Sequence, residues 1–152
     1  MNDPTFKKVL VKEEESLCAI HIYTDGASRG NPGKASWAYA FFKEGEDLPF
    51  VKSSGYIGIA TNNYAEYTAA IRALEKALEL GYKDVVLHSD SQLLVNQLLG
   101  IYRVKSKNIK PLYNKVKELL KKLENYRIVH ERRTHPFIKV VDKMCNEKLD
   151  EL

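Results

Sequence analysis

An apolar run at residues 17–23 leads directly into a glycine-rich segment at residues 24–33. The run has the length and composition of a buried strand. Asp25 follows at its end, and three glycines, a proline and an asparagine then favour a reversal of the chain. A carboxylate at a strand end, beside glycines that let another backbone approach closely, could hold a metal ion. An ordinary hairpin with an exposed acid would have the same sequence, so this segment alone does not decide between the two.

The length and composition predict a single domain. A chain of 152 residues is long enough to bury a substantial core. We expect residues 1–16, which are mostly polar, to form an N-terminal arm or an extra edge strand, and residues 17–152 to form the domain. No apolar run approaches the roughly 20 residues that span a bilayer, and the N-terminus lacks the apolar centre of a signal peptide. These features predict a cytoplasmic protein without a membrane partner, and we expect a monomer.

Charge and cysteine content leave two questions open. Residues 103–152 carry 14 Lys or Arg against 7 Asp or Glu, whereas residues 1–102 carry 10 against 13. The basic C-terminal half fits either a polyanionic partner or a lysine-rich solvated helix face. Cys18 and Cys145 lack the spacing of metal ligands, and they fit either free buried thiols in a reducing compartment or a disulfide.

The remaining pattern predicts an α/β fold with the element order βββαβααβα. Apolar periodicity and turn residues place the later strands at 35–42, 50–59, 84–89 and 126–131, and the helices at 64–80, 91–99, from 111 onward and at 137–149. The first three strands form an antiparallel meander. We expect a five-stranded mixed sheet, three strands antiparallel and two parallel, with helices on both faces.

Acidic residues fall at matching positions of these elements. Asp25 follows the first strand, Asp90 follows the fourth, and Glu66 lies in the first turn of the intervening helix. If the first and fourth strands are parallel neighbours, their carboxyl ends meet at one edge of the sheet, where ligands bind in open α/β folds. Asp142, in the first turns of the last helix, could reach the same edge.

Four clustered carboxylates repel one another unless cations compensate. Mg²⁺ is the natural choice because it takes oxygen ligands from a few carboxylates and from phosphate groups, and Mn²⁺ is a possible substitute. Two such ions could activate a water molecule and stabilise the leaving oxygen of a phosphodiester. The sequence therefore predicts a metal-dependent site, with Asp25, Glu66, Asp90 and Asp142 as ligands.

These segments resemble the successive motifs of type 1 ribonuclease H. The resemblance rests on DGASRGNPG at 25–33, TNNYAE at 61–66, SDSQ at 89–92 and GIYRVK at 100–105, and it covers about residues 17–150. It implies a ribonuclease H domain that cleaves the RNA strand of RNA–DNA hybrids by two-metal hydrolysis, leaving 5′-phosphate and 3′-hydroxyl ends. It further implies catalytic roles for the four acids and hybrid contacts by Gly26, Ser28, Asn31, Asn62, Asn63 and Gln92.

A chemical reason supports these contacts, since side-chain amides can both donate to and accept from the 2′-hydroxyl that distinguishes RNA. Asn62 or Asn63 could instead simply cap the helix that follows.

The sequence departs from the family in two places. Many members carry a histidine in the loop before the last helix, and a gapless alignment puts Arg132 there. We predict that Arg132 or Arg133, rather than His135, binds the scissile phosphate or the product, with Arg132 the first choice. The short link from Gly100 to Pro111 replaces a basic protrusion of some members, so Lys105, Lys107 and Lys110 are the candidates for contacts with DNA phosphates.

Two other functions share parts of this pattern. One is a non-catalytic module that binds hybrids or RNA, although such a module has no need for four mutually repelling acids. The other is a DNA nuclease of the same fold, such as an integrase or resolvase core, which gives no reason for the Asn and Gln set. The sequence does not decide whether double-stranded RNA is also cleaved or which metal is preferred.

Overall fold

The computed structural model describes residues 19–152, so the expected N-terminal arm and Cys18 lie outside the described residues. The elements follow the predicted order: β1 (Ile20–Gly30), β2 (Gly33–Lys43), β3 (Val51–Ala60), α2 (Asn62–Glu79), β4 (Asp84–Ser89), α3 (Gln92–Leu98), α4 (Lys110–Lys121), β5 (Asn125–His130) and α5 (Pro136–Asp150). Apart from β1, their boundaries lie within about two residues of the prediction. None of the helices in this part of the chain is long and apolar enough to cross a membrane.

The strands form one sheet in the order β3-β2-β1-β4-β5. β1 pairs antiparallel with β2, and β2 with β3, whereas β4 runs parallel to both β1 and β5. This confirms the mixed sheet expected from the sequence. It also confirms that the first and fourth strands are parallel neighbours, which was the assumption behind a shared acidic edge.

The first strand is longer than predicted. We expected it to end near Asp25, but β1 continues to Gly30 because β2 pairs with it along its whole length. The parallel pairing with β4 stops earlier, at Thr24 and Ser89. Asp25 is therefore the first residue of β1 beyond the end of β4, where the sheet opens. The chain reverses only at residues 31–32, between β1 and β2.

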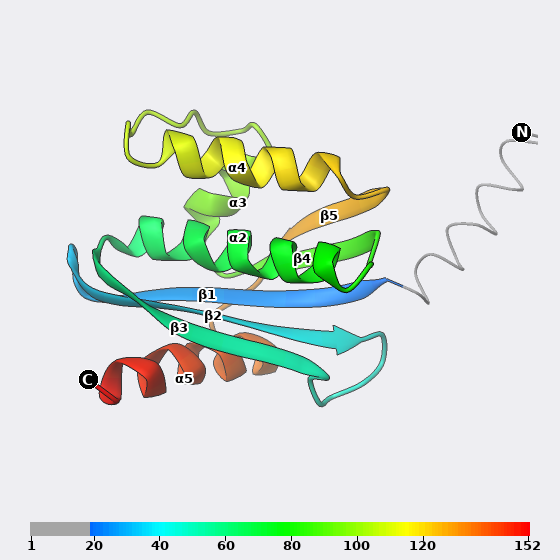
Figure 1. The fold of residues 1–152 in the computed structure, drawn as a ribbon, viewed down its shortest axis with the longest axis horizontal. Coiled ribbons are helices and arrows are strands. Elements are labelled where there is room, and N and C mark those ends of the chain that lie inside the picture. The colour runs from blue at the N-terminus through cyan, green and yellow to red at the C-terminus, as the bar shows by residue number, and fades with distance from the viewer. Residues whose placement is uncertain (1–18) are drawn as a thin grey trace, which may run out of the picture.

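Helices cover both faces of the sheet (Figure 1). α2 and α4 lie on one face, over a core that includes Ile22, Phe41 and Leu87. α5 lies on the other face, where Ile138, Val141 and Cys145 pack against Tyr23, Ala38, Ala40 and Phe42. Successive residues of β1 thus serve opposite cores, as the alternation of side chains along a strand requires.

α2 lies close to the sheet because its inner face is rich in alanine. Along its apolar stripe, Tyr67 and Leu74 are fully buried and Ile71 and Leu78 are partly buried. Five alanines are buried beside it: Ala65, Ala69, Ala70, Ala73 and Ala77. The side chain of Thr61 caps the helix by accepting a hydrogen bond from the Tyr64 backbone N–H at 3.2 Å. The helix therefore begins earlier than predicted, and Glu66 lies just beyond the first turn rather than within it.

Candidate active site

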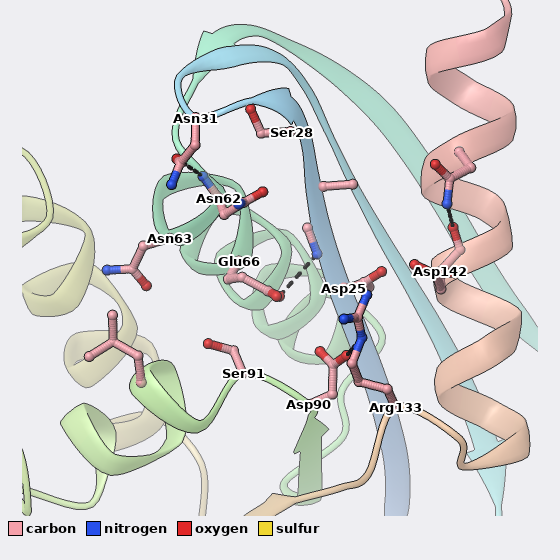
Figure 2. A pocket seen from close by; sticks show the side chains of 14 residues that line it. Asp25, Ser28, Asn31, Asn62, Asn63, Glu66, Asp90, Ser91, Arg133 and Asp142 are labelled. Carbon is pink, nitrogen blue, oxygen red and sulfur yellow. Dashed lines mark hydrogen bonds and ion pairs between the residues drawn. The ribbon is translucent and has the colours of Figure 1, made fainter.

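Three carboxylates meet where the parallel strands end. Oxygen atoms of Asp25, Glu66 and Asp90 all lie within 4.8 Å of one another. Asp25 extends from β1, Asp90 follows β4 and Glu66 reaches across from α2 (Figure 2). Their proximity follows from the sheet order, because β1 and β4 are neighbours and α2 crosses them.

Close contact between β1 and α2 fixes Glu66. The Gly26 backbone N–H donates a hydrogen bond to Glu66 Oε1 at 3.0 Å. A Cβ atom at position 26 would lie 2.2 Å from the backbone carbon of Ala65 and 2.4 Å from the Glu66 nitrogen. Glycine is therefore needed here for the approach of two backbones, which explains why a glycine follows the acid of β1.

Burial and the negative charges of neighbouring acids raise the pKa values of all three carboxyl groups. Asp25 is only 5% exposed. Burial raises its pKa well above the ordinary value, and the charges of Asp90 and Asp142 raise it further. Burial likewise raises the pKa of Glu66 well above its ordinary value, with contributions from the charges of Asp25 and Asp90. Burial also raises the pKa of Asp90, although the positive charge of Arg133 opposes the shift.

Asp142 approaches the cluster from α5, on the opposite face of the sheet. It is exposed, and it lies outside the group of three whose oxygens are within 4.8 Å of one another. It nevertheless lines the same cleft, and its proximity raises the pKa of Asp25. The Asn146 side-chain amide donates to the Asp142 backbone carbonyl at 3.0 Å, one helical turn further along.

The donor set fits a hard divalent cation. All four side chains offer carboxylate oxygens, the ligands that Mg²⁺ and Mn²⁺ accept, and there is no thiol or imidazole among them. The Arg133 guanidinium balances this negative charge only weakly, because its Nε atom is 3.8 Å from Asp90 Oδ2 and its side chain is 86% exposed. A bound cation would remove the repulsion that raises these pKa values.

The acids lie in an open cleft of about 630 Å³. Five of the residues predicted to contact substrate also line it: Gly26, Ser28, Asn31, Asn62 and Asn63. Thr61 rather than an asparagine caps α2, which leaves both amide side chains unused by the cap. Asn31 Oδ1 accepts a hydrogen bond from the Asn62 backbone N–H at 3.0 Å, tying the β1–β2 hairpin to the start of α2. The buried Oδ1 of Asn63 has no hydrogen-bond partner within residues 19–152.

Other predicted site residues lie elsewhere. Arg132, the first choice from the sequence, does not line the cleft, whereas Arg133 does. His135 is used structurally, since its Nδ1 accepts a hydrogen bond from the Phe137 backbone N–H at the start of α5. Exposed side chains at Gln92, Lys105 and Lys107 are also outside the cleft.

The prediction missed four residues that line the cleft, namely Ala27, Ser91, Leu93 and Asn146. The spacing of Asn146, four residues after Asp142 on one helix, was the available signal for it.

Comparisons with known proteins agree with this geometry. Residues 23–148 match the family described as Reverse transcriptase-like. Ribonuclease HI of Halobacterium salinarum is 37% identical over 132 residues, which are 87% of this chain but 65% of that protein. The chain thus spans about two thirds or less of the curated relatives that it matches.

Solved structures give the same assignment. The crystal structure of RNase H1 from Halobacterium salinarum superposes with a TM-score of 0.82 at 36% identity, covering 88% of this chain and 99% of that one. LC11-RNase H1 in complex with an RNA/DNA hybrid has a TM-score of 0.80 at 37% identity, covering 87% of this chain and 97% of that one. The chain therefore belongs to the Reverse transcriptase-like family, and its fold is that of type 1 ribonuclease H.

Proposed function

We propose that this protein is a ribonuclease H that hydrolyses the RNA strand of RNA–DNA hybrids and leaves 5′-phosphate and 3′-hydroxyl ends. The observation that carries the proposal is the group of three carboxylates within 4.8 Å at the floor of an open cleft. A merely structural cluster would not be expected to hold three acids together with raised pKa values.

Asp25, Glu66 and Asp90 would hold divalent cations, with Asp142 as the fourth ligand at the exposed side. Such cations, two with substrate bound, would activate a water molecule and stabilise the leaving oxygen. The Gly26 N–H holds Glu66 in place, and the pairing of β1 with β2 holds Asp25, so the ligands are positioned before substrate arrives. Mg²⁺ is the expected ion, and Mn²⁺ is expected to substitute for it.

The hybrid would lie along the cleft between the β1–β2 hairpin and the start of α2. Asn31, Asn62 and Asn63 line this part of the cleft, and their side-chain amides can donate to or accept from a 2′-hydroxyl. LC11-RNase H1, a structural relative, is known in complex with an RNA/DNA hybrid, which supports the same substrate here.

Positive side chains around the cleft would contact phosphates. Arg133 is the candidate for the scissile phosphate or the product, with Arg132 one residue away in the same loop. Lys105, Lys107 and Gln92 would contact the hybrid outside the cleft. Near the two lysines, residues 100–104 with Lys110 and Tyr113 enclose a second depression of about 480 Å³ that could receive the DNA backbone.

A strand-resolved cleavage assay tests the proposal. The purified chain is incubated with end-labelled RNA–DNA hybrid, double-stranded DNA or double-stranded RNA, with Mg²⁺, Mn²⁺ or EDTA. We expect metal-dependent cleavage of the RNA strand of the hybrid, and the double-stranded RNA lane shows whether that substrate is also cut. Hybrid binding without cleavage would favour a binding module, and cleavage of double-stranded DNA would favour a DNA nuclease.

A further inference from the structure

Four polar side chains outside the cleft form an unbranched chain of hydrogen bonds. Its links join Glu44 Oε1 to His21 Nε2 at 2.8 Å, His21 Nδ1 to His88 Nε2 at 2.9 Å, and His88 Nδ1 to Glu131 Oε2 at 2.6 Å. The residues come from β1, the turn after β2, β4 and the position after β5. None of them has a part in the reaction proposed above.

Counting protons along this chain shows that it carries one more than two neutral histidines provide. Each of the three links needs one hydrogen between its heavy atoms. Ionised Glu44 and Glu131 only accept, and a neutral imidazole has a single N–H, so two neutral rings supply two hydrogens. The third hydrogen makes one ring an imidazolium between two carboxylates.

Burial distinguishes the two rings. The His88 side chain is 8% exposed, so a positive charge on its ring would lose most of its hydration. The His21 side chain is 17% exposed and lies against Glu44, which is 47% exposed. The extra proton therefore belongs on His21, which then donates from both nitrogens, while neutral His88 donates from Nδ1.

The chain of hydrogen bonds also anchors the loop at residues 131–135, which carries Arg133. At the first end of this loop, the Glu131 side chain bonds His88 and its backbone N–H donates to Ser89 O at 2.8 Å. At the other end, the ring of His135 lies 5.1 Å from that of Tyr23, which stacks on His88 at 4.1 Å. The His88–Tyr23 pair thus touches both ends of residues 131–135.

We propose that His21 is a doubly protonated imidazolium between Glu44 and His88, and that the chain it completes positions the 131–135 loop, with Arg133, at the rim of the cleft. Its relevance to catalysis rests on the function proposed above for Arg133, whereas the protonation and the anchoring do not. The other titratable groups around the chain are His135 and Tyr23, and burial raises the pKa of Tyr23 to about 12, so its hydroxyl stays neutral.

Two substitutions separate protonation from geometry. In Glu44→Gln the side-chain amide can donate to His21 Nε2, so the chain keeps its links with His21 neutral. In His21→Leu both links through His21 are lost, and the partly exposed position tolerates the change. Glu46→Gln, an exposed acid in the same turn, is the control with an equal change in charge.

Long-range ¹H–¹⁵N correlation spectra of the ¹⁵N-labelled full chain at pH 7 test the proposal without substrate, so its failure is distinct from failure of the nuclease assignment. We expect both His21 nitrogens to be protonated in the wild type and in Glu46→Gln, and one to be unprotonated in Glu44→Gln. We expect the Glu131 amide to exchange about tenfold faster in His21→Leu, as for loss of a charge-assisted hydrogen bond. An unprotonated His21 nitrogen in the wild type, or unchanged exchange in His21→Leu, would overturn the proposal.

Discussion

Asp25 and Glu66 have pKa values raised well above the ordinary range, mainly by burial and then by neighbouring acids. The folded protein therefore binds protons at these sites more tightly than the unfolded chain does. As pH rises above the ordinary carboxylate pKa near 4, deprotonation favours the unfolded state, and the stabilisation that these groups give in their protonated form is lost. At neutral pH without metal, the cluster lowers the stability of the fold.

Asp25→Asn should accordingly stabilise the metal-free protein at pH 7, because the amide removes a buried charge and its repulsion. We expect Tm to rise by a few degrees, at about 2–4 °C per kcal/mol for a protein of this size. The gain should shrink at pH 4, where the wild-type carboxyl is already protonated in the folded state. Thermal unfolding in EDTA measures both values, with the exposed Asp47→Asn as control. A lower Tm for Asp25→Asn at pH 7 would contradict this electrostatic account.

Gly26→Ala should disrupt the site through sterics alone. The added Cβ would meet the Ala65 backbone at 2.2 Å, so β1 and α2 must separate and Glu66 must move. We expect a loss of about 1–3 kcal/mol in the free energy of unfolding, together with most of the activity. Gly45→Ala is the matched control, since nothing lies within 4 Å of its Cβ and its positive φ of 77° gives only the ordinary strain of about 1 kcal/mol. Denaturant unfolding that shows equal losses for the two variants would argue against the close-approach explanation.

At the scale of elements, the unequal pairing of β1 creates the site. β2 supports β1 to Gly30, while β4 leaves it at Thr24, so Asp25 is held by one neighbour and open on its other side. α2 and α5 then bring Glu66 and Asp142 from opposite faces of the sheet. The position of α5 depends on its apolar contacts with the sheet.

Ile138→Ala tests how firmly α5 is held. Ile138 is 1% exposed and lies in the core that joins α5 to the sheet. We expect a loss of about 2–5 kcal/mol in the free energy of unfolding, from lost burial and the cavity left behind. The exposed neighbour Lys139→Ala should change this free energy by less than about 0.5 kcal/mol in the same denaturant titrations. A change below about 1 kcal/mol for Ile138→Ala would mean that α5 is not fixed by this contact.

The segment between α3 and α4 carries the two lysines that we propose to contact phosphates. If Lys105 and Lys107 contact phosphates, replacing both with alanine should make the salt dependence of hybrid binding less steep. The slope of the logarithm of the association constant against the logarithm of the salt concentration should become smaller in magnitude by about two. Hybrid binding measured in Ca²⁺ or EDTA over a range of salt concentrations gives the slope. Lys52→Ala with Lys83→Ala is the control, because these exposed lysines, one on β3 and one just before β4, do not line the cleft. An unchanged slope in the Lys105 and Lys107 variant would remove the segment from the interface.

At the scale of the whole molecule, the fold was predictable and parts of the site were not. Element order and the two-faced core follow from apolar periodicity, which is local along the chain. The end of β1 was predicted wrongly because it depends on how far β2 pairs with it, and that pairing is not local. The choice between Arg132 and Arg133 turned on one residue in a loop whose course is set by contacts of Glu131 and His135. Asn146 was missed although its spacing of four residues from Asp142 on the predicted last helix was available.

Metal binding should stabilise the whole molecule. A cation that binds only the folded state raises its stability by RT ln(1 + [L]/Kd). We expect Mg²⁺ to raise the Tm of the wild type and to have much less effect on Asp25→Asn. Differential scanning fluorimetry against Mg²⁺ concentration, with Na⁺ at equal ionic strength as control, measures the shift. Equal shifts in the two proteins would place the bound cation elsewhere.

The most direct test of the central claim is the rate of RNA-strand cleavage in a labelled hybrid, measured for the wild type and Asp25→Asn with hybrid binding followed in parallel. We expect Mg²⁺-dependent cleavage by the wild type. In Asp25→Asn we expect a rate lower by more than about a hundredfold, since even partners one layer outside a metal's ligands contribute 10–100-fold. The variant should still bind the hybrid. Undiminished cleavage by Asp25→Asn, or wild-type cleavage in EDTA, would contradict the assignment of the acid cluster as a metal-dependent active site.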